Sequence, residues 1–286
     1  SRKMIFNEEG IDPLEVINTI ASGDSFQQSK FIDKMRQLNL RNSIFIDITA
    51  SETVAGAYEE ILKETISIVT PNKIAATQSF AHYQLLKSTA NKFKSQFLFE
   101  TNVGAGLPVL STLSDLVKSG DRIIKIEAVL SGTLNFIFNN YNAKRSFVEV
   151  VQQAKKEGYT EPDPRLDLSG EDVMRKILIL ARESGYQFEF EDVVGNNFLP
   201  TNCQITEGEE DFYIKLAANE VHFAKLYNQA ASNSCKLRYV ATFENQKLTT
   251  GLSQIGETHP FYQLEGKDNI VLFYTERYPE QPLVIK

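Results

Sequence analysis

The sequence has few of the residues that define several common site classes. Its two cysteines, Cys203 and Cys235, cannot build a disulfide framework and form no C-x-x-C pair. Its three histidines, His82, His222 and His259, lie far apart and lack the spacing of zinc ligands. These absences argue against a disulfide-stapled scaffold and against a structural zinc site.

Long apolar runs and basic blocks are also missing. No run reaches membrane-spanning length, and the first residues, SRKMIFNEEG, lack the apolar core of a signal peptide. We therefore expect no membrane association and a cytoplasmic location. A net charge of -7 without a basic face argues against general nucleic-acid binding. With 286 residues, of which 42% are hydrophobic, the chain can hold one large or two ordinary globular domains.

The first third of the chain alternates helical and strand patterns. Strands are expected at 43–48, 66–69 and 96–99, and helices at 13–21, 25–38, 54–63 and 79–93. Such alternation predicts parallel β-α-β units, as in half of a doubly wound sheet. Ligands bind such sheets beyond the carboxyl ends of the strands, here at 49–51, 71–73 and 101–103. The GxGxxG turn is absent, so a dinucleotide interpretation must suppose that the first β-α unit is missing.

From residue 104 the pattern changes. Helices are expected at 108–118, 134–141 and 209–232, strands at 123–130, 237–243, 248–252 and 269–275, and a loop at 199–208. The predicted fold class is α/β. Residues 1–107 would form a partial Rossmann-type nucleotide-binding domain, and residues 108–286 a second, mixed α+β domain with an antiparallel sheet.

The segment Gly158–Lys176, GYTEPDPRLDLSGEDVMRK, is the densest in chemistry. A capping box at Ser146 and Glu149 begins the helix before it, and a second box at Ser169 and Asp172 is expected to begin the next helix. Its two prolines stiffen the loop at 161–167, so that the carboxylates are held in a fixed geometry. Rigid acids beside a lysine suggest a cationic substrate.

Asp172 and Lys176 share one face of the expected helix because they are four residues apart. Two interpretations remain open. The pair can be a capping acid with a surface ion pair of roughly 0.2 to 0.5 kcal/mol, or it can belong to a functional site. A third interpretation takes the carboxylates as the acid and base of a hydrolase, which leaves Lys73 and Lys176 without a role.

Four segments occur in an order that resembles the homoserine dehydrogenase family. They are TPNK (70–73), TNVGAGLP (101–108), SGTLNFIF (131–138) and the 158–176 block, which is the most specific. The resemblance covers nearly the whole chain and is greatest to the dehydrogenase part of the bacterial fusion with aspartate kinase. It implies an NAD(P)-dependent oxidoreductase that interconverts L-homoserine and L-aspartate 4-semialdehyde by hydride transfer, in threonine and methionine biosynthesis.

The resemblance assigns substrate binding to five positions. Glu161 and Asp172 match residues that bind homoserine, and acids suit its ammonium group. Asp167 and the turn of Gly132 and Thr133 are expected to assist. In place of Leu166, many relatives carry a further acid, which puts the role of that one position in doubt.

Two lysines match residues close to the chemistry. Lys176 matches the family's proton donor and acceptor, and its apolar surroundings favour a neutral amine while the neighbouring acids oppose it. Lys73 matches a second lysine that can steady the reacting oxygen or share the proton transfer. We favour Lys176 as the base.

The resemblance also implies a bound cofactor. Thr49, Ala50 and Lys73 match contact positions at the strand ends. Arg2 and Lys3 fall where cations accept a ribose 2′-phosphate, so we expect NADP to be accepted and preferred to NAD. The alternative is that Arg2 and Lys3 are only a frayed terminus.

Glu100, Val103, Ala105 and Leu107 match a monovalent-cation loop. Backbone carbonyls and one carboxylate suit a hard ion such as sodium, although an ordinary glycine-rich crossover remains the alternative. The resemblance further implies a homodimer through the second domain, which would bind the substrate and dimerise, and a fusion with an aspartate kinase. The competing hypothesis is a catalytically silent dimerisation or regulatory module of a larger protein, because the phosphate-binding turn is absent.

Overall fold

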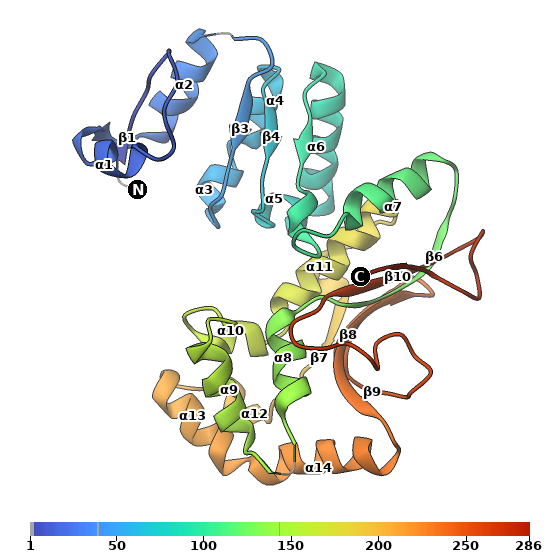
Figure 1. The fold of residues 1–286 in the computed structure, drawn as a ribbon. Helices are drawn as coiled ribbons and strands as arrows, with labels where there is room; N and C mark the ends of the chain where they lie inside the picture. The colour runs from blue at the N-terminus through green and yellow to red at the C-terminus, as the bar shows by residue number, and fades with distance from the viewer. Residues whose placement is uncertain (1–2, 39, 143) are drawn as a thin grey trace. The chain divides into compact units, whose positions relative to one another are not determined.

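A computed structural model describes residues 3–38, 40–142 and 144–286 (Figure 1). The chain forms two compact units. The first contains residues up to Ala75 together with Ala81–Phe99, and the second contains Ala76–Phe80 together with Glu100–Lys286. The short piece Ala76–Phe80, called here the crossing segment, therefore belongs to the second unit while the chain on both sides belongs to the first.

The first unit is built on a parallel sheet. Its strands β3 (Ile44–Ile46), β4 (Ser67–Val69) and β5 (Phe97–Leu98) are hydrogen-bonded in that order. Helices α3 (Glu52–Ala55), α4 (Tyr58–Lys63), α5 (Ile74–Thr77) and α6 (Phe80–Phe93) connect them. The expected parallel β-α-β pattern is confirmed, with strands shorter than the sequence suggested.

A small antiparallel pair precedes this sheet. Strands β1 (Lys3–Met4) and β2 (Asp24–Ser25) pair with each other, and α1 (Val16–Thr19), the 3-10 turn η1 (Ile20–Ser22) and α2 (Gln28–Leu38) complete the region. The sequence predicted its two helices but not the strand pair. Two-residue strands leave no alternating pattern from which they could be recognised.

Aromatic rings and aliphatic side chains fill the core of the first unit. Tyr58 and Ile68 are fully buried, because α4 packs against the central strand β4. The Tyr58 ring meets those of Phe45 and Phe97 edge to face, with centroids 6.5 and 5.8 Å apart. Edge-to-face pairs of this kind add about 0.5 to 1.5 kcal/mol each to the free energy of apolar burial.

The second unit contains a mixed six-stranded sheet. Its strands are β6 (Ile123–Val129), β7 (Val193–Asn196), β8 (Lys236–Glu244), β9 (Lys247–Ile255), β10 (Ile270–Thr275) and β11 (Leu283–Ile285), in the order β11-β10-β6-β8-β9-β7. The strands expected from the sequence pair antiparallel, and Asn245 and Gln246 form the turn between β8 and β9 with φ values of 51° and 56°. The sheet is antiparallel as expected except at one edge, where β7, a strand that the sequence did not predict, pairs with β9 in parallel.

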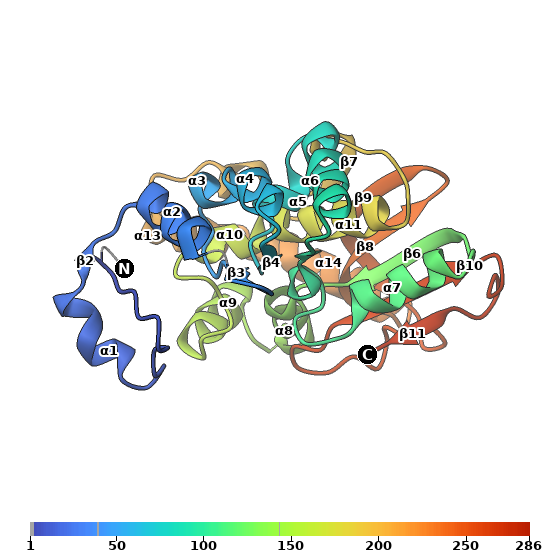
Figure 2. The same cartoon turned by 90° about the horizontal axis from the view of Figure 1, so that it is seen from above.

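Eight helices and two short 3-10 segments of the described chain belong to this unit. They are α7 (Val109–Lys118), α8 (Gly132–Asn140), α9 (Phe147–Lys156), α10 (Pro164–Leu168), α11 (Glu171–Glu183), α12 (Thr201–Gln204), α13 (Glu209–Ala218), α14 (Glu220–Ser232), η2 (Glu100–Asn102) and η3 (Phe190–Asp192). Helices α8, α11 and α14 pack on β8, and α9 lies against α8 and α13 (Figures 1 and 2). Helix α12 occupies part of the segment expected to be a loop.

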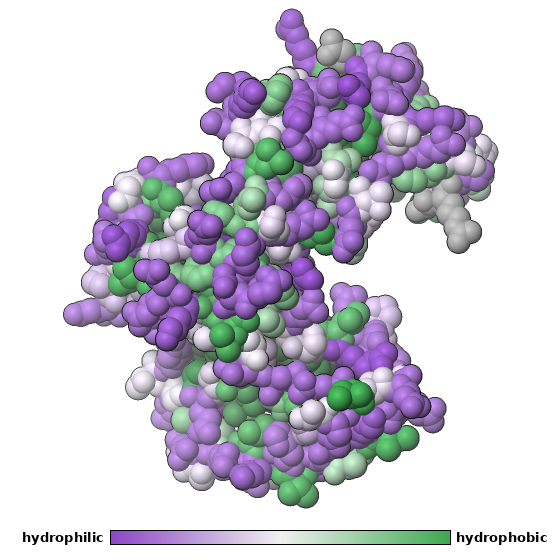
Figure 3. Space-filling model, turned by 180° about the vertical axis from the view of Figure 1, so that it is seen from behind, coloured by the Kyte–Doolittle hydropathy of each residue, from purple (hydrophilic) through white to green (hydrophobic). Residues whose placement is uncertain are grey.

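Helix α11 is buried deeply. Residues 177–181 are all buried, because one side of the helix packs on β8 and β9 while another side meets α7. Within residues 3–38, 40–142 and 144–286, no helix has both the length and the apolar character needed to cross a bilayer. On the face shown in Figure 3, hydrophilic groups predominate and apolar groups are scattered among them.

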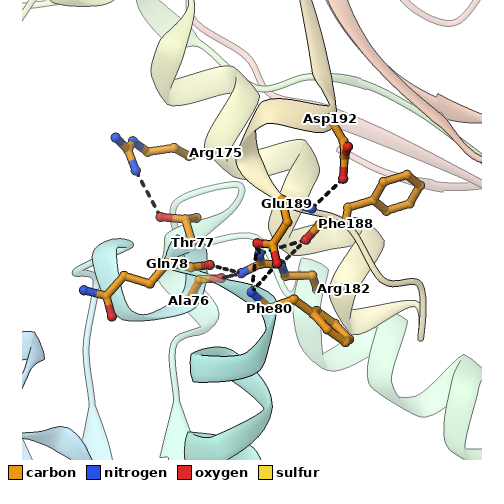
Figure 4. Close-up of polar contacts among 9 residues, drawn as sticks. All are labelled: Ala76, Thr77, Gln78, Phe80, Arg175, Arg182, Phe188, Glu189 and Asp192. Carbon is orange, nitrogen blue, oxygen red and sulfur yellow. Dashed lines mark hydrogen bonds and ion pairs between the residues drawn. The ribbon is translucent and has the colours of Figure 1, made fainter.

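The crossing segment is held by an arginine of α11 (Figure 4). The Arg182 side chain is 0% exposed and donates hydrogen bonds to the backbone oxygens of Ala76 at 2.9 Å, Gln78 at 2.7 Å and Phe188 at 2.8 Å. Its guanidinium group also lies 3.3 Å from the carboxylate of Glu189. One buried cation thus joins two stretches of chain that are about a hundred residues apart in the sequence.

Glu189 also binds the crossing segment, at its last residue. Its carboxylate accepts hydrogen bonds from the backbone N–H of Phe80 at 2.9 and 3.1 Å (Figure 4). Phe80 opens α6, so the acid satisfies a donor that the first turn of a helix leaves without an intrahelical partner. The crossing segment is therefore fixed to the second unit through both its carbonyl and its amide groups.

Candidate active site

A hydrogen-bonded centre forms at the start of α8. The Ser131 side chain accepts a hydrogen bond from Leu134 N at 3.1 Å and so caps the helix. Two residues later, Thr133 Oγ1 lies 2.8 Å from Asp167 Oδ1 and also within hydrogen-bonding distance of the backbone oxygen of Tyr159. A hydroxyl group has one hydrogen, so Thr133 can donate to only one of these oxygens at a time.

Asp167 binds the backbone of the substrate-site candidate Glu161. Its second oxygen accepts a hydrogen bond from Glu161 N at 2.8 Å. Burial raises the pKa of Asp167 above its ordinary value, and the charges of Glu161 and Asp172 act in the same direction. The hydrogen bonds from Glu161 N and Thr133 oppose this rise but do not cancel it. The three acids are therefore close enough to influence one another.

The loop after Glu161 turns into α10. Asp163 caps that helix by accepting a hydrogen bond from Arg165 N at 3.0 Å, with Pro164 at the first helical position. The Arg165 guanidinium binds both oxygens of Asp163 and holds the pKa of that carboxyl below its ordinary value. Asp163 is thus occupied as a cap and an ion-pair partner, while Asp167 faces Thr133.

The predicted capping box at Ser169 and Asp172 is wrong. Helix α11 has Gly170 as its N-cap, in a left-handed conformation with φ 75°, and no side chain caps it. Ser169 instead ends α10 and accepts a hydrogen bond from Glu171 N at 3.2 Å. A Cβ atom at residue 170 would lie 2.2 Å from the Tyr239 hydroxyl oxygen, so both the backbone angle and the space require glycine.

Lys176 points back to the start of α8. Its Nζ donates to the backbone oxygen of Leu130 at 2.7 Å and pairs with Asp172 Oδ2 at 2.7 Å. The lysine side chain is 16% exposed, whereas that of Asp172 is 50% exposed. The pair is therefore half buried and tied to the strand end before Gly132, which is not the geometry of a freely moving surface pair.

These contacts bring the predicted residues of the second unit together. The N-terminus of α8 is surrounded by Gly132, Thr133, Asp167 and Lys176. The edge of this cluster is formed by Glu161 and Asp172. Gly132 is also restricted, since a Cβ atom there would lie 3.2 Å from the backbone oxygen of Lys267. The sequence placed these residues in one segment and one turn; the structure adds Tyr159 and Leu130 as backbone partners.

A second polar centre lies at the strand ends of the first unit. Asp47 follows β3, is 2% exposed and accepts hydrogen bonds from the Tyr58 hydroxyl at 2.5 Å, Asn72 Nδ2 at 3.1 Å and Thr49 N at 2.7 Å. Burial alone would raise the pKa of Asp47, but the bonds from Tyr58, Thr49 and Asn72 together lower it. The sequence analysis did not single out Asp47, although an aspartate directly after an apolar strand could have indicated it.

The expected cofactor contacts lie beside this centre. Thr49 and Ala50 are exposed just beyond β3, and Lys73 is half buried beyond β4. Lys3 donates to the backbone oxygen of Gly23 at 3.0 Å, which ties it to the β1–β2 region. Arg2 lies outside the described residues.

The expected cation loop precedes α7 and is hydrogen-bonded to its first turn. The Glu100 carboxylate accepts hydrogen bonds from Leu110 N and Ser111 N, both at 2.8 Å, and so caps α7. Gly104 and Ala105 adopt left-handed backbone angles, with φ 80° and 53°. The carboxylate thus has a structural role at the helix N-terminus, whether or not it also binds an ion. Across residues 3–38, 40–142 and 144–286, no cluster of three or more His, Cys, Asp or Glu side chains could hold a metal.

By its architecture, the chain is an α/β protein with a parallel-sheet unit and a mixed-sheet unit that carries an acid and lysine cluster. Residues 18–100 match the family description "Homoserine dehydrogenase, NAD binding domain", and residues 108–286 match "Homoserine dehydrogenase". The chain belongs to the homoserine dehydrogenase family, and its first unit corresponds to the family's NAD-binding domain. The predicted family and fold class are thereby confirmed.

Curated relatives include both fused and separate proteins. The bifunctional aspartokinase/homoserine dehydrogenase 1 of Arabidopsis thaliana, a chloroplast protein, is 39% identical over 100% of this chain, which spans 32% of its length. The homoserine dehydrogenase of Paracoccidioides brasiliensis is 40% identical over 85% of this chain and 68% of its own length. The chain thus spans about a third of the length of the fused plant relatives.

Solved structures share the fold. A Candida auris protein described as of unknown function has a TM-score of 0.89 at 30% identity and covers 100% of this chain and 82% of its own. A hyperthermophilic archaeal homoserine dehydrogenase in complex with NADPH has a TM-score of 0.70 at 21% identity, over 96% of this chain and 76% of its own. At that identity the second likeness shows the fold alone.

Proposed function

We propose that the protein catalyses the NAD(P)-dependent interconversion of L-homoserine and L-aspartate 4-semialdehyde. One observation carries the proposal: in a chain of this family, three acids and a half-buried lysine gather at the N-terminus of α8. The hydrolase interpretation lacks support of this kind, because it gives no role to the lysine at the centre of the cluster.

The acids would bind the substrate's ammonium group. Glu161 and Asp172 are exposed at the border of the cluster, where they can make charge-assisted hydrogen bonds with the ligand. Asp167 and Thr133 hold the backbone of Glu161 and Tyr159, so they would fix the geometry of the site. Gly132 leaves room at the start of α8.

Lys176 would move the proton of the substrate hydroxyl. Its Nζ is held between Asp172 Oδ2 and the backbone oxygen of Leu130, each 2.7 Å away, so the amine is oriented before a substrate arrives. Lys73 remains the second candidate, either to share this proton transfer or to stabilise charge on the reacting oxygen.

The cofactor would be held by the first unit. Thr49, Ala50 and Lys73 lie at the strand ends where dinucleotides bind in open parallel sheets, and Arg2 and Lys3 would meet a 2′-phosphate. The polar strand ends, organised by buried Asp47, fit such a ligand. The bound nicotinamide accepts or supplies the hydride, and NADP is the expected form.

A monovalent cation is a further part of the proposal. The carbonyl oxygens of Val103, Ala105 and Leu107 and the carboxylate of Glu100 would bind sodium, because hard ions prefer oxygen ligands held in a rigid loop. Exchanging sodium for choline at constant ionic strength should lower the thermal midpoint and the turnover rate. Equal values in both salts would remove the ion from the proposal.

The assembly and location inferred from the family also remain proposals. We infer a homodimer formed by the second domain, a division into domains at residues 107 and 108, and a cytoplasmic location. Fusion with aspartokinase occurs among the relatives, whose printed names also include chloroplast proteins. Whether this chain has such a kinase part is best tested by sequencing the complete natural transcript.

The decisive assay follows NADP reduction at increasing L-homoserine concentrations with the whole natural protein. Homoserine-dependent reduction, and NADPH oxidation by L-aspartate 4-semialdehyde in reverse, are the expected results. A folded dimer that binds neither ligand would instead support the catalytically silent module.

A further inference from the structure

One face of α8 rests on the segment that leads into β10. Asn135 Nδ2 donates to the backbone oxygen of Asp268 at 3.1 Å, and Asn139 Nδ2 donates to that of Gly266 at 3.2 Å. Gly132 lies on the same side, one turn earlier, and allows close approach of Lys267. The residues on both sides of Lys267 are therefore bonded to the helix that begins the candidate active site.

The earlier part of the loop between β9 and β10 is also held by hydrogen bonds. Arg238 of β8 is 1% exposed and donates to the backbone oxygens of Phe261 at 3.0 Å and Leu264 at 2.9 Å. The side chains of Phe261 and Leu264 are buried in an apolar cluster on the sheet. The loop between β9 and β10 thus has a fixed path, and Lys267 has a fixed backbone position.

The Lys267 side chain lies beside Tyr159, a residue that borders the candidate site. Its Nζ lies 5.3 Å from the centre of the Tyr159 ring, and the backbone oxygen of Tyr159 is a partner of Thr133. The side chain is exposed, and in the described part of the chain its ammonium group forms no ion pair with a carboxylate. The Lys267 ammonium group therefore lies near an aromatic ring and is otherwise open to solvent, so it can bind an anion.

We propose that Lys267 binds the α-carboxylate of the amino-acid substrate, an inference that rests on the proposed function. The site already described is rich in acids, which suit the ammonium group of an amino acid but repel its carboxylate. The nearby cations Arg165 and Lys176 are paired with Asp163 and Asp172. Among the described residues, Lys267 is a cation beside Gly132 and Tyr159 that can balance the substrate's negative charge.

This assignment makes Lys267 a specificity-determining residue. It would distinguish an amino acid from an amino alcohol without taking part in the chemical step. Binding that is equal in the ground state and the transition state changes KM and leaves kcat unaltered. The test therefore compares substrates that differ only at the carboxylate.

The experiment measures KM and kcat for Lys267→Met, Lys267→Arg and Lys247→Met in the whole natural protein. The substrates are L-homoserine, L-homoserinamide and 3-amino-1-propanol. Loss of a charge-assisted bond should raise the KM of Lys267→Met for L-homoserine about tenfold or more, with kcat little changed. The KM values for both analogues, which keep the ammonium group and lack the carboxylate, should be unaffected. Lys267→Arg should keep most of the affinity, and the exposed Lys247 of β9 serves as the matched control.

Equal increases in KM for homoserine and its amide, or an unchanged KM for homoserine, would overturn the assignment. If the unmodified protein oxidises no homoserine, the proposed function fails, and calorimetric binding of the same compounds then decides the inference. A loss of affinity in Lys267→Met confined to L-homoserine supports it. The assignment is refuted if the unmodified protein and Lys267→Met bind L-homoserine with equal affinity, or if neither binds it.

Discussion

Lys176 and Lys215 are a natural pair for comparison at the scale of single residues. Each lysine pairs with the aspartate four residues earlier, at 2.7 Å, and each donates to a backbone oxygen from another segment. Only Lys176 lies in the acid cluster. Their local geometry is the same, so a difference in function must come from their surroundings.

Replacing Lys176 by alanine should reduce kcat by about 100-fold or more, because a positioned proton-transfer group is lost, while the circular dichroism spectrum stays unchanged. Lys215→Ala should leave kcat as it is. Asp172→Ala should mainly raise the KM for homoserine. Similar small effects of Lys176→Ala and Lys215→Ala would mean that Lys176 is only an ion-pair partner.

Asp167 and Asp163 should respond to pH in opposite directions. The pKa of Asp167 is raised from its ordinary value of 3.8, so the free energy of unfolding decreases as pH rises from that value through the folded-state pKa. Asp167→Asn should abolish this decrease, so its free energy of unfolding, compared with that of the unmodified protein at the same pH, should be more favourable at pH 7 than at pH 3.

The pKa of Asp163 is lowered, so the unmodified protein gains stability from this carboxylate as pH rises. Asp163→Asn lacks that gain and should become less stable than the unmodified protein as pH rises. Urea denaturation at several pH values measures both, and parallel curves would contradict the assignment.

At the scale of elements, the junction between α10 and α11 places Asp172 and Lys176. Gly170 allows the junction because it takes a left-handed conformation against Tyr239. The sequence analysis predicted a capping box there, because S-x-x-D is its usual signature. The pattern could not show that the tyrosine of a strand about seventy residues later occupies the space beside residue 170.

Gly170→Ala should lower the free energy of unfolding by about 3 kcal/mol, from backbone strain plus the clash with Tyr239. Gly158→Ala is the matched control, since Gly158 has nearly the same φ, 74°, and no atom within 4 Å of an added Cβ. It should cost only about 1 to 2 kcal/mol. Equal midpoints in urea for the two variants would show that the Tyr239 contact is relaxed at little cost.

Other elements show what local patterns can and cannot reveal. Ser146 and Glu149 form the predicted capping box, because this signal lies within the first turn of one helix. Strand β7 has only one buried residue, Val193, and was missed. Its place in the sheet depends on pairing with β9, a contact between distant segments that leaves no local pattern.

At the scale of the whole molecule, the fold class and the family were predictable, whereas the contacts of Asp47 and Arg182 were not. A buried aspartate or arginine is an unusual residue type in a core, and its partners can come from anywhere in the chain. Here they include a tyrosine hydroxyl, one side-chain amide and backbone carbonyls, none of which carries a sequence signature. The proposed substrate residues of the second unit, by contrast, come from one segment, 158–176, and one turn, at Gly132 and Thr133, so local motifs could indicate them.

Replacing Arg182 by methionine should destabilise the protein by about 3 kcal/mol or more, because the buried carbonyls of Ala76, Gln78 and Phe188 lose their donor. Arg182→Lys should recover little, since an ammonium group cannot reproduce the planar set of donors. Arg175→Met is a control, because Arg175 donates to Thr77 but is partly exposed. Chemical denaturation would contradict the prediction if all three variants had the same midpoint.

The crossing segment also limits how the gene for such a protein can be cut or recombined. The chain changes unit after Ala75, again after Phe80 and a third time after Phe99. A gene fragment that ends near residue 100 therefore encodes the nucleotide-binding sheet together with the crossing segment, whose hydrogen-bond partners Arg182 and Glu189 are encoded more than a hundred codons after it. The two units are not interchangeable modules, and a recombination event that exchanged one of them would also have to preserve the fit between Ala76–Phe80 and Arg182.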